Sequence, residues 1–281
     1  MAFKITCESS ADLTQELYKK NKIGVIPFTI TQGEHSFKDG TEISNEEMFQ
    51  YFNETKQLPK TSAVNSADYL DFFNEQNTED EGLIHFCISS KISSSYNNAV
   101  TAAKELKNVY VIDSLSLSSG IGLQVLYACK LRDKGVPIAE AVEIINKRRS
   151  LVRINFVVDT LTYLHKGGRC SALTMLGANL LGIKPSIIVS NGRMGVDKKY
   201  RGKINKVLDK YIIDTLNDNP NREDDMCLLT YSSATDEMKK IAYDTLNEKA
   251  TFKKIIETTA GGTVATHCGP NTLGIIFFAK E

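Results

Sequence analysis

Short apolar runs rich in β-branched residues alternate with amphipathic stretches of helical period in the first half of the chain. The runs at 83–88 and 109–112 predict buried strands, and the stretch 94–107 between them predicts a helix because it holds good helix formers and no proline. A strand, a helix and a strand in this order form a βαβ unit with parallel strands. The same patterns predict further strands at 3–7 and 23–30, and further helices at 120–134 and 138–149. The first half is therefore predicted to hold a parallel sheet with helices on its faces.

The second half carries a different pattern. Asn191-Gly192 lies between apolar runs at 183–189 and 193–196, which is a strong signal for a two-residue β-hairpin. Further strands are predicted at 152–158, 226–231, 254–258 and 273–279, helices at 171–181, 204–216 and 237–248, and a glycine-rich loop from 261 to 274. Because a hairpin introduces antiparallel strands, this half is predicted to have a mixed sheet, and a domain boundary near 150–160 follows.

The composition is that of an ordinary globular protein and excludes several classes of function. A chain of 281 residues favours two domains that share one cleft. The net charge is zero and the sequence pI is about 6.9, so no strong field points to nucleic acid. The six cysteines form no C-x-x-C pair and no Cys/His cluster, so neither a metal site nor a disulfide framework is expected. No leader pattern opens the sequence and no apolar run approaches 18 residues, which predicts a cytoplasmic protein.

The segment 89–96 (SSKISSSY) is the most informative candidate for a binding site. It joins a predicted strand to a predicted helix, at the carboxyl end of a parallel strand, where open α/β sheets bind ligands. One serine is needed to cap the helix, and five serines are more than a cap needs. A helix N-terminus favours an anion, and added hydroxyls would make it a cradle for a carboxylate or phosphate. Capping alone and anion binding both remain open.

A serine nucleophile is a second interpretation of the same segment. Ser93 lies in neither a G-x-S-x-G elbow nor an S-x-x-K arrangement. A catalytic serine also needs a base, and His267 is the histidine best placed to reach a ligand, since it lies in a predicted loop between glycines. His85 in mid-strand and His35 in a polar turn are interpreted as structural. An acyl hydrolase that uses Ser93 and His267 therefore remains an alternative.

Two further segments carry weaker signals. The turns at 166–169 (KGGR) and 261–262 match no nucleotide-binding motif, so both are interpreted as tight turns. The first lies beside a predicted helix start, so a simple anion site is an alternative there. The segment 198–203 (KKYRGK) is the densest basic stretch, and it shows neither the interleaved aromatic residues nor the recognition-helix pattern of a nucleic-acid-binding surface. Solvated surface, docking to an acidic partner and contact with anionic lipid are the three interpretations of that stretch.

Several of these segments together resemble one protein family. Residues 8–12 (ESSAD) resemble the D-S-T-A-D opening of DegV proteins, 37–40 (FKDG) their aromatic-basic-D-G turn, and 60–62 (KTS) the start of their T-S-Q-P-S segment. Residues 89–96 resemble S-S-G-L-S-G-T-Y, 158–169 resemble V-D-T-L…K-G-G-R, 198–202 cover the basic-x-R-G position, and 266–270 (THCGP) resemble T-H-T-G-P. The segments follow the family's order over nearly the whole chain.

This resemblance implies a fold and a function. The family is similar to the fatty-acid-binding subunits of bacterial fatty acid kinase, in which an N-terminal three-layer α/β/α domain with a parallel sheet precedes a two-layer α/β domain with a mixed sheet. Transferred to this chain, the domains are 1–152 and 153–281, with the lipid site between or beside them. One long-chain fatty acid would be the ligand, with no cofactor, and a separate ATP-dependent kinase subunit would phosphorylate its carboxylate. The chain itself would be a non-catalytic subunit.

The resemblance also assigns residues. Thr61, Ser93 and His267 match the family's carboxylate-binding positions, and Ser62 and Ser94 are further candidates for headgroup contacts. Arg201-Gly202 matches the kinase-facing position, so Lys199, Arg201 and Lys203 are candidates for partner docking. Transient contact with the inner membrane face is a further expectation. Ala63-Val64-Asn65 replaces Q-P-S, and Lys91 and Ser94 replace glycines, so the detail of the headgroup site is expected to differ. A regulatory module for another small anion is the remaining alternative.

Overall fold

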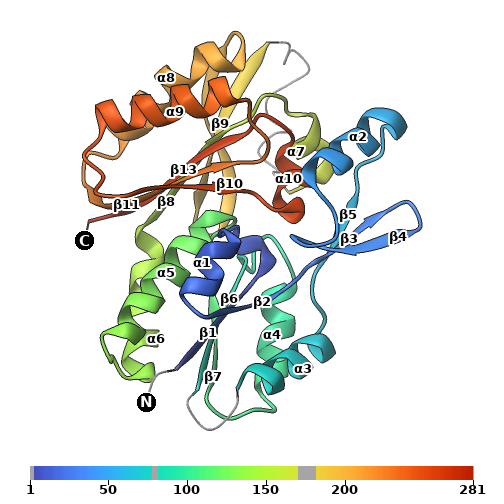
Figure 1. Cartoon of the computed structure of the whole chain (residues 1–281), viewed down its shortest axis with the longest axis vertical. Coiled ribbons are helices and arrows are strands. Elements are labelled where there is room, and N and C mark those ends of the chain that lie inside the picture. The colour runs from blue at the N-terminus through green and yellow to red at the C-terminus, as the bar shows by residue number, and fades with distance from the viewer. Residues whose placement is uncertain (1–2, 78–81, 170–181, 281) are drawn as a thin grey trace.

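The computed structural model describes residues 3–77, 82–169 and 182–280, and its first sheet is parallel throughout. Its order is β2-β1-β6-β7, formed by Ile23–Ile26, Lys4–Glu8, Leu83–Cys87 and Val109–Asp113. Side chains alternate between the two faces of β1: Glu8 bonds to Tyr69 of α3 (Ser66–Gln76), whereas the adjacent Cys7 faces Tyr18 of α1 (Gln15–Lys20) and α5 (Ser119–Asp133). Helix α4 (Ser95–Ala103) packs beside α3, and α6 (Ile138–Arg148) beside α5 (Figure 1). The predicted βαβ unit and the three-layer arrangement are confirmed.

The second sheet is mixed, as predicted. Its order is β10-β9-β8-β13-β11-β12, and β11 pairs with β12 in parallel while the other pairs are antiparallel. The strands span Arg193–Arg201, Ile183–Ser190, Val152–Val157, Leu273–Ala279, Arg222–Tyr231 and Ile255–Thr259. Helices α8 (Ile204–Asp218) and α9 (Asp236–Lys249) cover one face, and α5 packs on the other (Figure 1). The predicted hairpin is present, with positive φ at both Asn191 (49°) and Gly192 (78°), as a type I′ turn requires.

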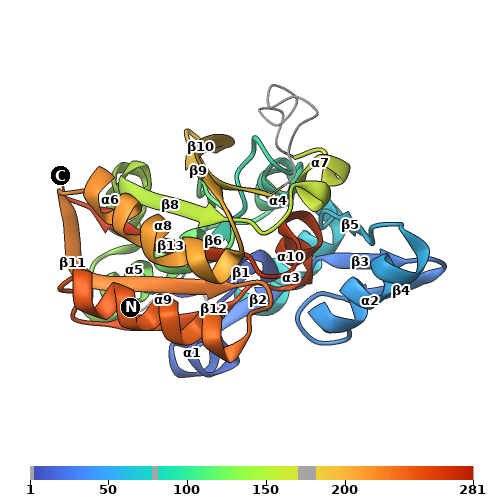
Figure 2. The ribbon, with the colours of Figure 1, turned by 90° about the horizontal axis from the view of Figure 1, so that it is seen from above.

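A third, antiparallel sheet corrects one prediction. The run at 23–30 is not a single strand, because β2 ends at Ile26 and β3 (Thr29–Gln32) belongs to a different sheet, with order β4-β3-β5. Pro27 lies between them and cannot donate to a strand ladder, so the ladder of the first sheet stops before it. The other strands are β4 (His35–Lys38) and β5 (Lys60–Ser62), so His35 begins a strand and does not lie in a turn. Together with α2 (Asn45–Thr55) this sheet projects from the body beside α7 (Thr162–Gly167) and α10 (Gly262–Cys268) (Figure 2).

The glycine-rich segment is also corrected. Residues 261–274 are not a continuous loop, because helix α10 (Gly262–Cys268) lies within them. Gly262 allows this helix to approach β3 closely, since a Cβ there would lie 2.4 Å from Ile30 Cδ1. Helix α7 lies where the sequence patterns predicted no helix or strand, and its C-cap is Gly168, which has φ 66°. The predicted helix 171–181 lies outside the described residues.

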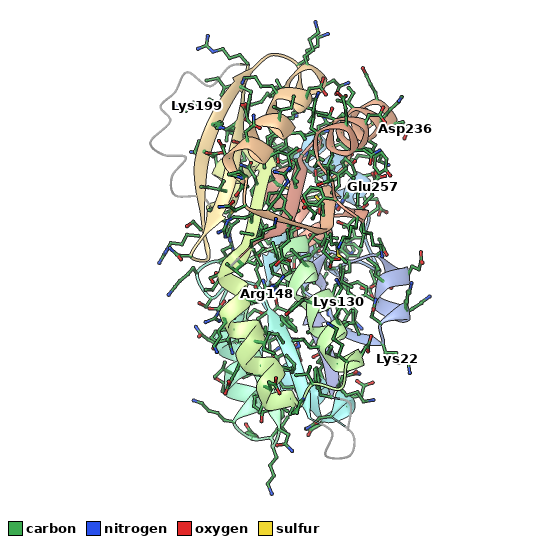
Figure 3. The ribbon with its side chains drawn as sticks, turned by 90° about the vertical axis from the view of Figure 1, so that its left-hand side faces the viewer. Lys22, Lys130, Arg148, Lys199, Asp236 and Glu257 are labelled. Atoms are coloured by element: carbon green, nitrogen blue, oxygen red, sulfur yellow. The ribbon has the colours of Figure 1, made fainter. Side chains whose placement is uncertain are left out.

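The two larger sheets share one core. The largest cluster of buried apolar side chains includes Phe3 and Ile5 of the first sheet together with Ile154 and Ile276 of the second. At the edge of this contact Lys130 pairs with Asp225 at 2.5 Å, and Arg148 pairs with Glu223 at 2.5 Å (Figure 3). The division at residues 152/153 falls after the first residue of β8 and stays a prediction. Short 3₁₀ turns occupy Ser9–Ala11 and Arg149–Leu151. Within the described residues, no helix is both long and apolar enough to span a membrane.

Candidate functional site

The structure brings three residues that were predicted as site residues to one cavity. A cavity of about 340 Å³ is lined by Thr61 of β5, Ser93 of the turn before α4, and His267 of α10. Ser94 also lines it. Much of the remaining wall is apolar and comes from both larger sheets and the loops beside them, including Phe28, Ile88, Leu117, Ile154, Phe156 and Ile276. The cavity therefore combines an apolar interior with hydroxyl groups.

Thr61 is oriented by the alternation of strand β5. It pairs with Ile30 of β3, so its side chain points to the opposite face from those of Lys60 and Ser62, which are exposed. Its Oγ1 lies 3.0 Å from His267 Nε2, although 206 positions separate the two residues in sequence. Ser62 lines a groove on the outer side and does not line the cavity.

His267 is held in a neutral form. Burial lowers its pKa to about 4, and the nearby positive charge of Arg169 acts in the same direction. One nitrogen is engaged with Thr61, whereas Nδ1 is buried and has no hydrogen-bond partner among the described residues. Because the ring carries no charge at neutral pH, it can orient the Thr61 hydroxyl through either tautomer.

This lowered pKa predicts a pH dependence of stability. The unfolded chain binds a proton at His267 near pH 6.5 while the folded chain does not until about pH 4, so the free energy of unfolding falls as the pH is lowered through this window. His267→Gln removes this contribution, so urea denaturation of the ligand-free variant is expected to show a flatter dependence between pH 7 and 4.5. His85, with a pKa lowered to about 3 by burial, retains the same sign of dependence in the variant. Equal slopes for the variant and the unchanged protein would contradict the prediction.

Ser93 accepts a backbone hydrogen bond at the start of α4 and still has a hydroxyl hydrogen to donate. The turn is closed by the N–H groups of Ile92 and Ser93, which both donate to the carbonyl of Ser89. Ser93 Oγ then accepts from the N–H of Ser95 at 3.2 Å, at the start of α4. An oxygen that accepts from the backbone leaves its own hydrogen free for a ligand. Ser93 can therefore accept a hydrogen bond from the helix backbone and donate one to an anion at the same time, so the two interpretations of this segment do not exclude each other.

Arg169 lines the cavity, although it was not individually predicted as a ligand-binding residue. It follows the turn Lys166-Gly167-Gly168, and one guanidinium nitrogen donates to the carbonyl of Gly167 at 2.8 Å. The KGGR segment was recognised only as a tight turn or simple anion site. The sequence position of Arg169 before a predicted helix does not reveal that it lines the same cavity as Thr61 and Ser93. Only the folded chain shows this.

Several polar side chains in the cavity wall have their hydroxyl groups bonded within the protein. Thr230 donates to Ser119 at 2.8 Å, Thr272 donates to the carbonyl of Cys268 at 3.0 Å, and Ser232 donates to the carbonyl of Gly269. Thr263 Oγ1, in contrast, is buried without a partner. The three bonded hydroxyl groups therefore have no hydrogen left to donate to an anion, in contrast to Ser93.

The predicted docking residues lie away from the cavity. Lys199 and Arg201 are on the edge strand β10 and Lys203 follows it, and all three are exposed (Figure 3 labels Lys199). The neighbouring Lys198 pairs with Asp218 at 2.5 Å. The structure thus places these three charges together on one edge of the second sheet.

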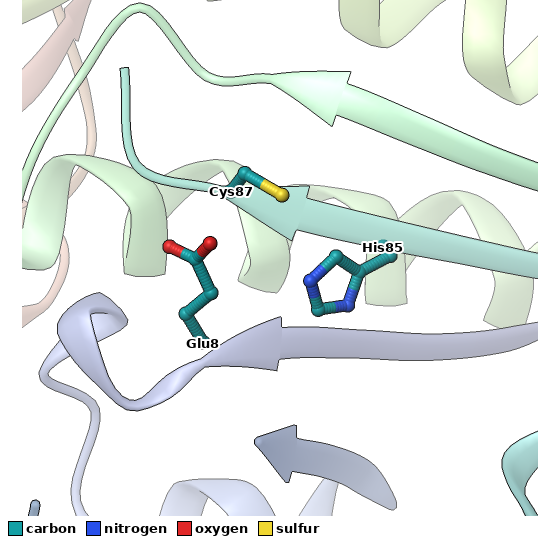
Figure 4. Close-up of side chains that lie close together, drawn as sticks. All are labelled: Glu8, His85 and Cys87. Atoms are coloured by element: carbon teal, nitrogen blue, oxygen red, sulfur yellow. The ribbon is translucent and has the colours of Figure 1, made fainter. Parts of the chain in front are cut away.

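A separate buried cluster contains Glu8, His85 and Cys87 (Figure 4). Such side chains can bind metals, but Glu8 already accepts hydrogen bonds from Tyr69 Oη at 2.6 Å and from the N–H of Ile88 at 2.7 Å. His85 Nδ1 lies 2.8 Å from Thr6 Oγ1. Burial raises the pKa of Glu8, and the hydrogen bonds oppose that shift. These contacts join β1, α3 and the end of β6, so the cluster holds the first sheet together.

Comparison with known proteins assigns the chain to a protein family. A family model described as "Uncharacterised protein, DegV family" matches residues 2–280. This chain belongs to the DegV family. A DegV domain-containing protein of Clostridium acetobutylicum is 31% identical over 279 residues, which cover 99% of this chain and 98% of the relative. The resemblance found in the sequence is confirmed.

Solved structures of DegV proteins share the whole fold. A fatty-acid-binding DegV family protein from Thermus thermophilus superposes with a TM-score of 0.92 at 25% identity, and the match covers 100% of both chains. A Thermotoga maritima protein for which a fatty-acid-binding function was found gives a TM-score of 0.85 at 26% identity and 100% coverage of both. A stearic-acid-binding protein from Eubacterium ventriosum gives 0.84 at 26% identity, covering 99% of this DegV chain and 98% of its own. The predicted fold class is confirmed.

Proposed function

We propose that this DegV protein binds one long-chain fatty acid and presents its carboxylate to a separate ATP-dependent kinase subunit, which converts it to an acyl phosphate. The observation that carries the proposal is the cavity of about 340 Å³, in which an apolar interior meets Thr61, Ser93 and His267. That volume falls within the range of about 300–1,000 Å³ that is typical of small-molecule sites. The fatty-acid binding of the solved relatives supports the same ligand class.

The apolar wall provides the affinity. A chain of about 16 carbons has ~15 apolar carbons, and each buried CH₂ contributes roughly 0.8 kcal/mol, so the gross gain is about 12 kcal/mol before the entropy of association is subtracted. Residues such as Phe156 and Ile276 supply the surface against which the acyl chain would pack. This gain allows the headgroup to be held by neutral donors alone.

The carboxylate is assigned to the hydroxyl end. Ser93 has a free hydroxyl hydrogen, and Thr61 has one when His267 carries its proton on Nε2 and donates to Thr61 Oγ1. Each charge-assisted hydrogen bond contributes roughly 1.5–3 kcal/mol. Neutral donors suit a carboxylate that must later react, because a bidentate arginine would hold both of its oxygens. Ser94 lines the same cavity and is a further headgroup contact in this proposal.

The contacts of His267 do not favour a hydrolase. A serine nucleophile would need His267 as its base, and the base would need a third group to orient it. His267 Nε2 instead contacts Thr61, and Nδ1 has no partner among the side chains that the structure describes. This chain is therefore proposed as the subunit that holds the substrate, and the chemical step is assigned to its partner.

The kinase is proposed to dock near the basic edge formed by Lys199, Arg201 and Lys203. Exposed positive charges on an edge strand favour an acidic partner and accelerate its association. The same charges would allow brief contact with an anionic membrane surface, where fatty acids are exchanged.

Native mass spectrometry tests the lipid-binding proposal directly. Protein purified from bacterial cells without detergent is expected to carry a single adduct with the mass of a long-chain fatty acid. Solvent extraction of the same sample should release that acid in about a 1:1 molar ratio to protein. An adduct of a different chemical class would favour a module for another small anion, and turnover of an ester substrate that is lost in Ser93→Ala would favour the hydrolase.

A further inference from the structure

A second hollow lies on the outer side of the carboxylate site. Its volume is about 630 Å³, and its wall includes four cationic side chains, which we call the basic groove: Lys56, Lys60, Lys166 and Arg169. Among the described residues of that wall, no side chain is a carboxylate. Within residues 3–77, 82–169 and 182–280, none of the four cations forms an ion pair. The basic groove is thus a concentration of unneutralised positive charge.

Three separate segments build this groove. Lys56 is the residue that ends α2, Lys60 points outward from β5, and Lys166 lies in the last turn of α7. Lys166 Nζ donates to the carbonyl of Lys56 at 2.9 Å and lies 5.2 Å from the centroid of the Phe52 ring. These contacts fix the position of one ammonium group, and no carboxylate in the described part of the chain pairs with it. Figure 1 and Figure 2 show the end of α2, β5 and α7 side by side.

The groove and the lipid cavity share a wall. Thr61, Arg169 and His267 line both hollows. The unpartnered Nδ1 of His267 lies against Gly167, since a Cβ at that position would be 2.4 Å from it. Gly167 itself lines the groove. A group bound in the groove would therefore lie next to the carboxylate that Thr61 is proposed to hold.

We propose that the basic groove binds a phosphoryl group immediately outside the fatty acid carboxylate. This inference deepens the proposed function and rests on it. Phosphate is the anion that several convergent lysines and one arginine recognise, through charge-assisted hydrogen bonds. The phosphoryl group belongs either to the polyphosphate of the nucleotide donor or to the acyl phosphate product. Both place a phosphorus atom beside the carboxylate.

The transfer step explains why the charge lies there. A carboxylate oxygen forms a bond to the terminal phosphorus of a nucleoside triphosphate while the bond from that phosphorus to its bridging oxygen breaks. The products are the acyl phosphate and the nucleoside diphosphate, and no proton is transferred because the carboxylate is already ionised. Negative charge is spread over the phosphoryl oxygens throughout this step, and positive groups at fixed positions stabilise it.

The test compares two ligands of the same acyl length in protein freed of lipid. One is the fatty acid, and the other is an acyl phosphonate, a stable analogue of the acyl phosphate. In the double variant Lys60→Gln/Lys166→Gln the affinity for the phosphonate is expected to fall about tenfold or more, while that for the fatty acid changes less than about threefold. Lys104→Gln/Lys107→Gln is the matched control, because it removes two exposed lysine charges beyond α4 and is expected to change neither affinity.

A second titration separates the two sources of phosphate. Pyrophosphate is added to the protein already loaded with fatty acid. Binding that is lost in Lys60→Gln/Lys166→Gln assigns the groove to the donor polyphosphate, and an effect on the phosphonate alone assigns it to the product. Equal affinities of the double variant and the unchanged protein for both phosphorus ligands would overturn this inference and leave fatty acid binding standing. Failure of the unchanged protein to bind the fatty acid would refute the proposed function itself.

Discussion

Ser93→Ala is expected to reduce fatty acid affinity by about 10–100-fold and to reduce acyl phosphate formation by the kinase in parallel. The hydroxyl of Ser93 is proposed to donate to the carboxylate, and a charge-assisted hydrogen bond of roughly 1.5–3 kcal/mol corresponds to that range. Affinity is measured by displacement of a fluorescent fatty acid from lipid-free protein. Acyl phosphate is measured by trapping with hydroxylamine after addition of a bacterial fatty acid kinase and ATP.

The control for Ser93→Ala must match the backbone hydrogen bond that this variant loses at the start of α4. Ser93 Oγ also accepts from the N–H of Ser95, so its loss is expected to destabilise the fold by about 1 kcal/mol regardless of any ligand. Thr14 caps α1 through the N–H of Leu17 at 3.2 Å, and it does not line the cavity. Thr14→Ala should thus show a comparable loss of stability with fatty acid affinity unchanged. If Ser93→Ala retains lipid as well as Thr14→Ala does, the carboxylate is held elsewhere.

Glu8→Ala is expected to lower the free energy of unfolding by about 3–5 kcal/mol. The carboxylate is fully buried, and it accepts hydrogen bonds from Tyr69 Oη and from the N–H of Ile88. Removal takes the acceptor from the N–H of Ile88 and from the buried Ser10 hydroxyl, while Tyr69 Oη keeps its contact with Ser95 Oγ. Each unsatisfied group costs about 1–3 kcal/mol in addition to the cavity that forms. Urea denaturation at pH 7 measures the change, and it should be among the largest of any single substitution in the first sheet.

Tyr69→Phe provides the comparison. This variant removes one donor and keeps the ring, which packs against Phe73 at a centroid distance of 5.5 Å. Its expected loss of about 1–2 kcal/mol should be well below that of Glu8→Ala. Equal losses for the two variants would indicate that the bond from Ile88 adds nothing to stability.

Hydrophobic patterning alone was enough for most of the elements of this fold. The βαβ unit from β6 through α4 to β7 and the hairpin at Asn191-Gly192 depend on local periodicity and turn chemistry, so neighbouring residues suffice to predict them. The helix Gly262–Cys268 was predicted as loop because its glycines suggested turns, whereas Gly262 serves close packing against Ile30. The short strands β4 and β5 were also missed, since three or four residues carry little periodicity.

The site shows the same division between local and long-range information. The position of Ser93 between a strand and a helix made anion binding one of two interpretations from the sequence by itself, because a helix N-terminus has unpaired N–H groups wherever it occurs. Thr61 rested on family resemblance until the fold placed its hydroxyl 3.0 Å from His267. The basic groove depends still more on the fold, because Lys56 and Lys166 lie 110 positions apart in sequence and meet only when β5 and α7 pack beside α10. The sequence by itself determined the local secondary structure and turns, because these depend on neighbouring residues. Tertiary packing decided which side chains from distant segments line the same cavity or groove.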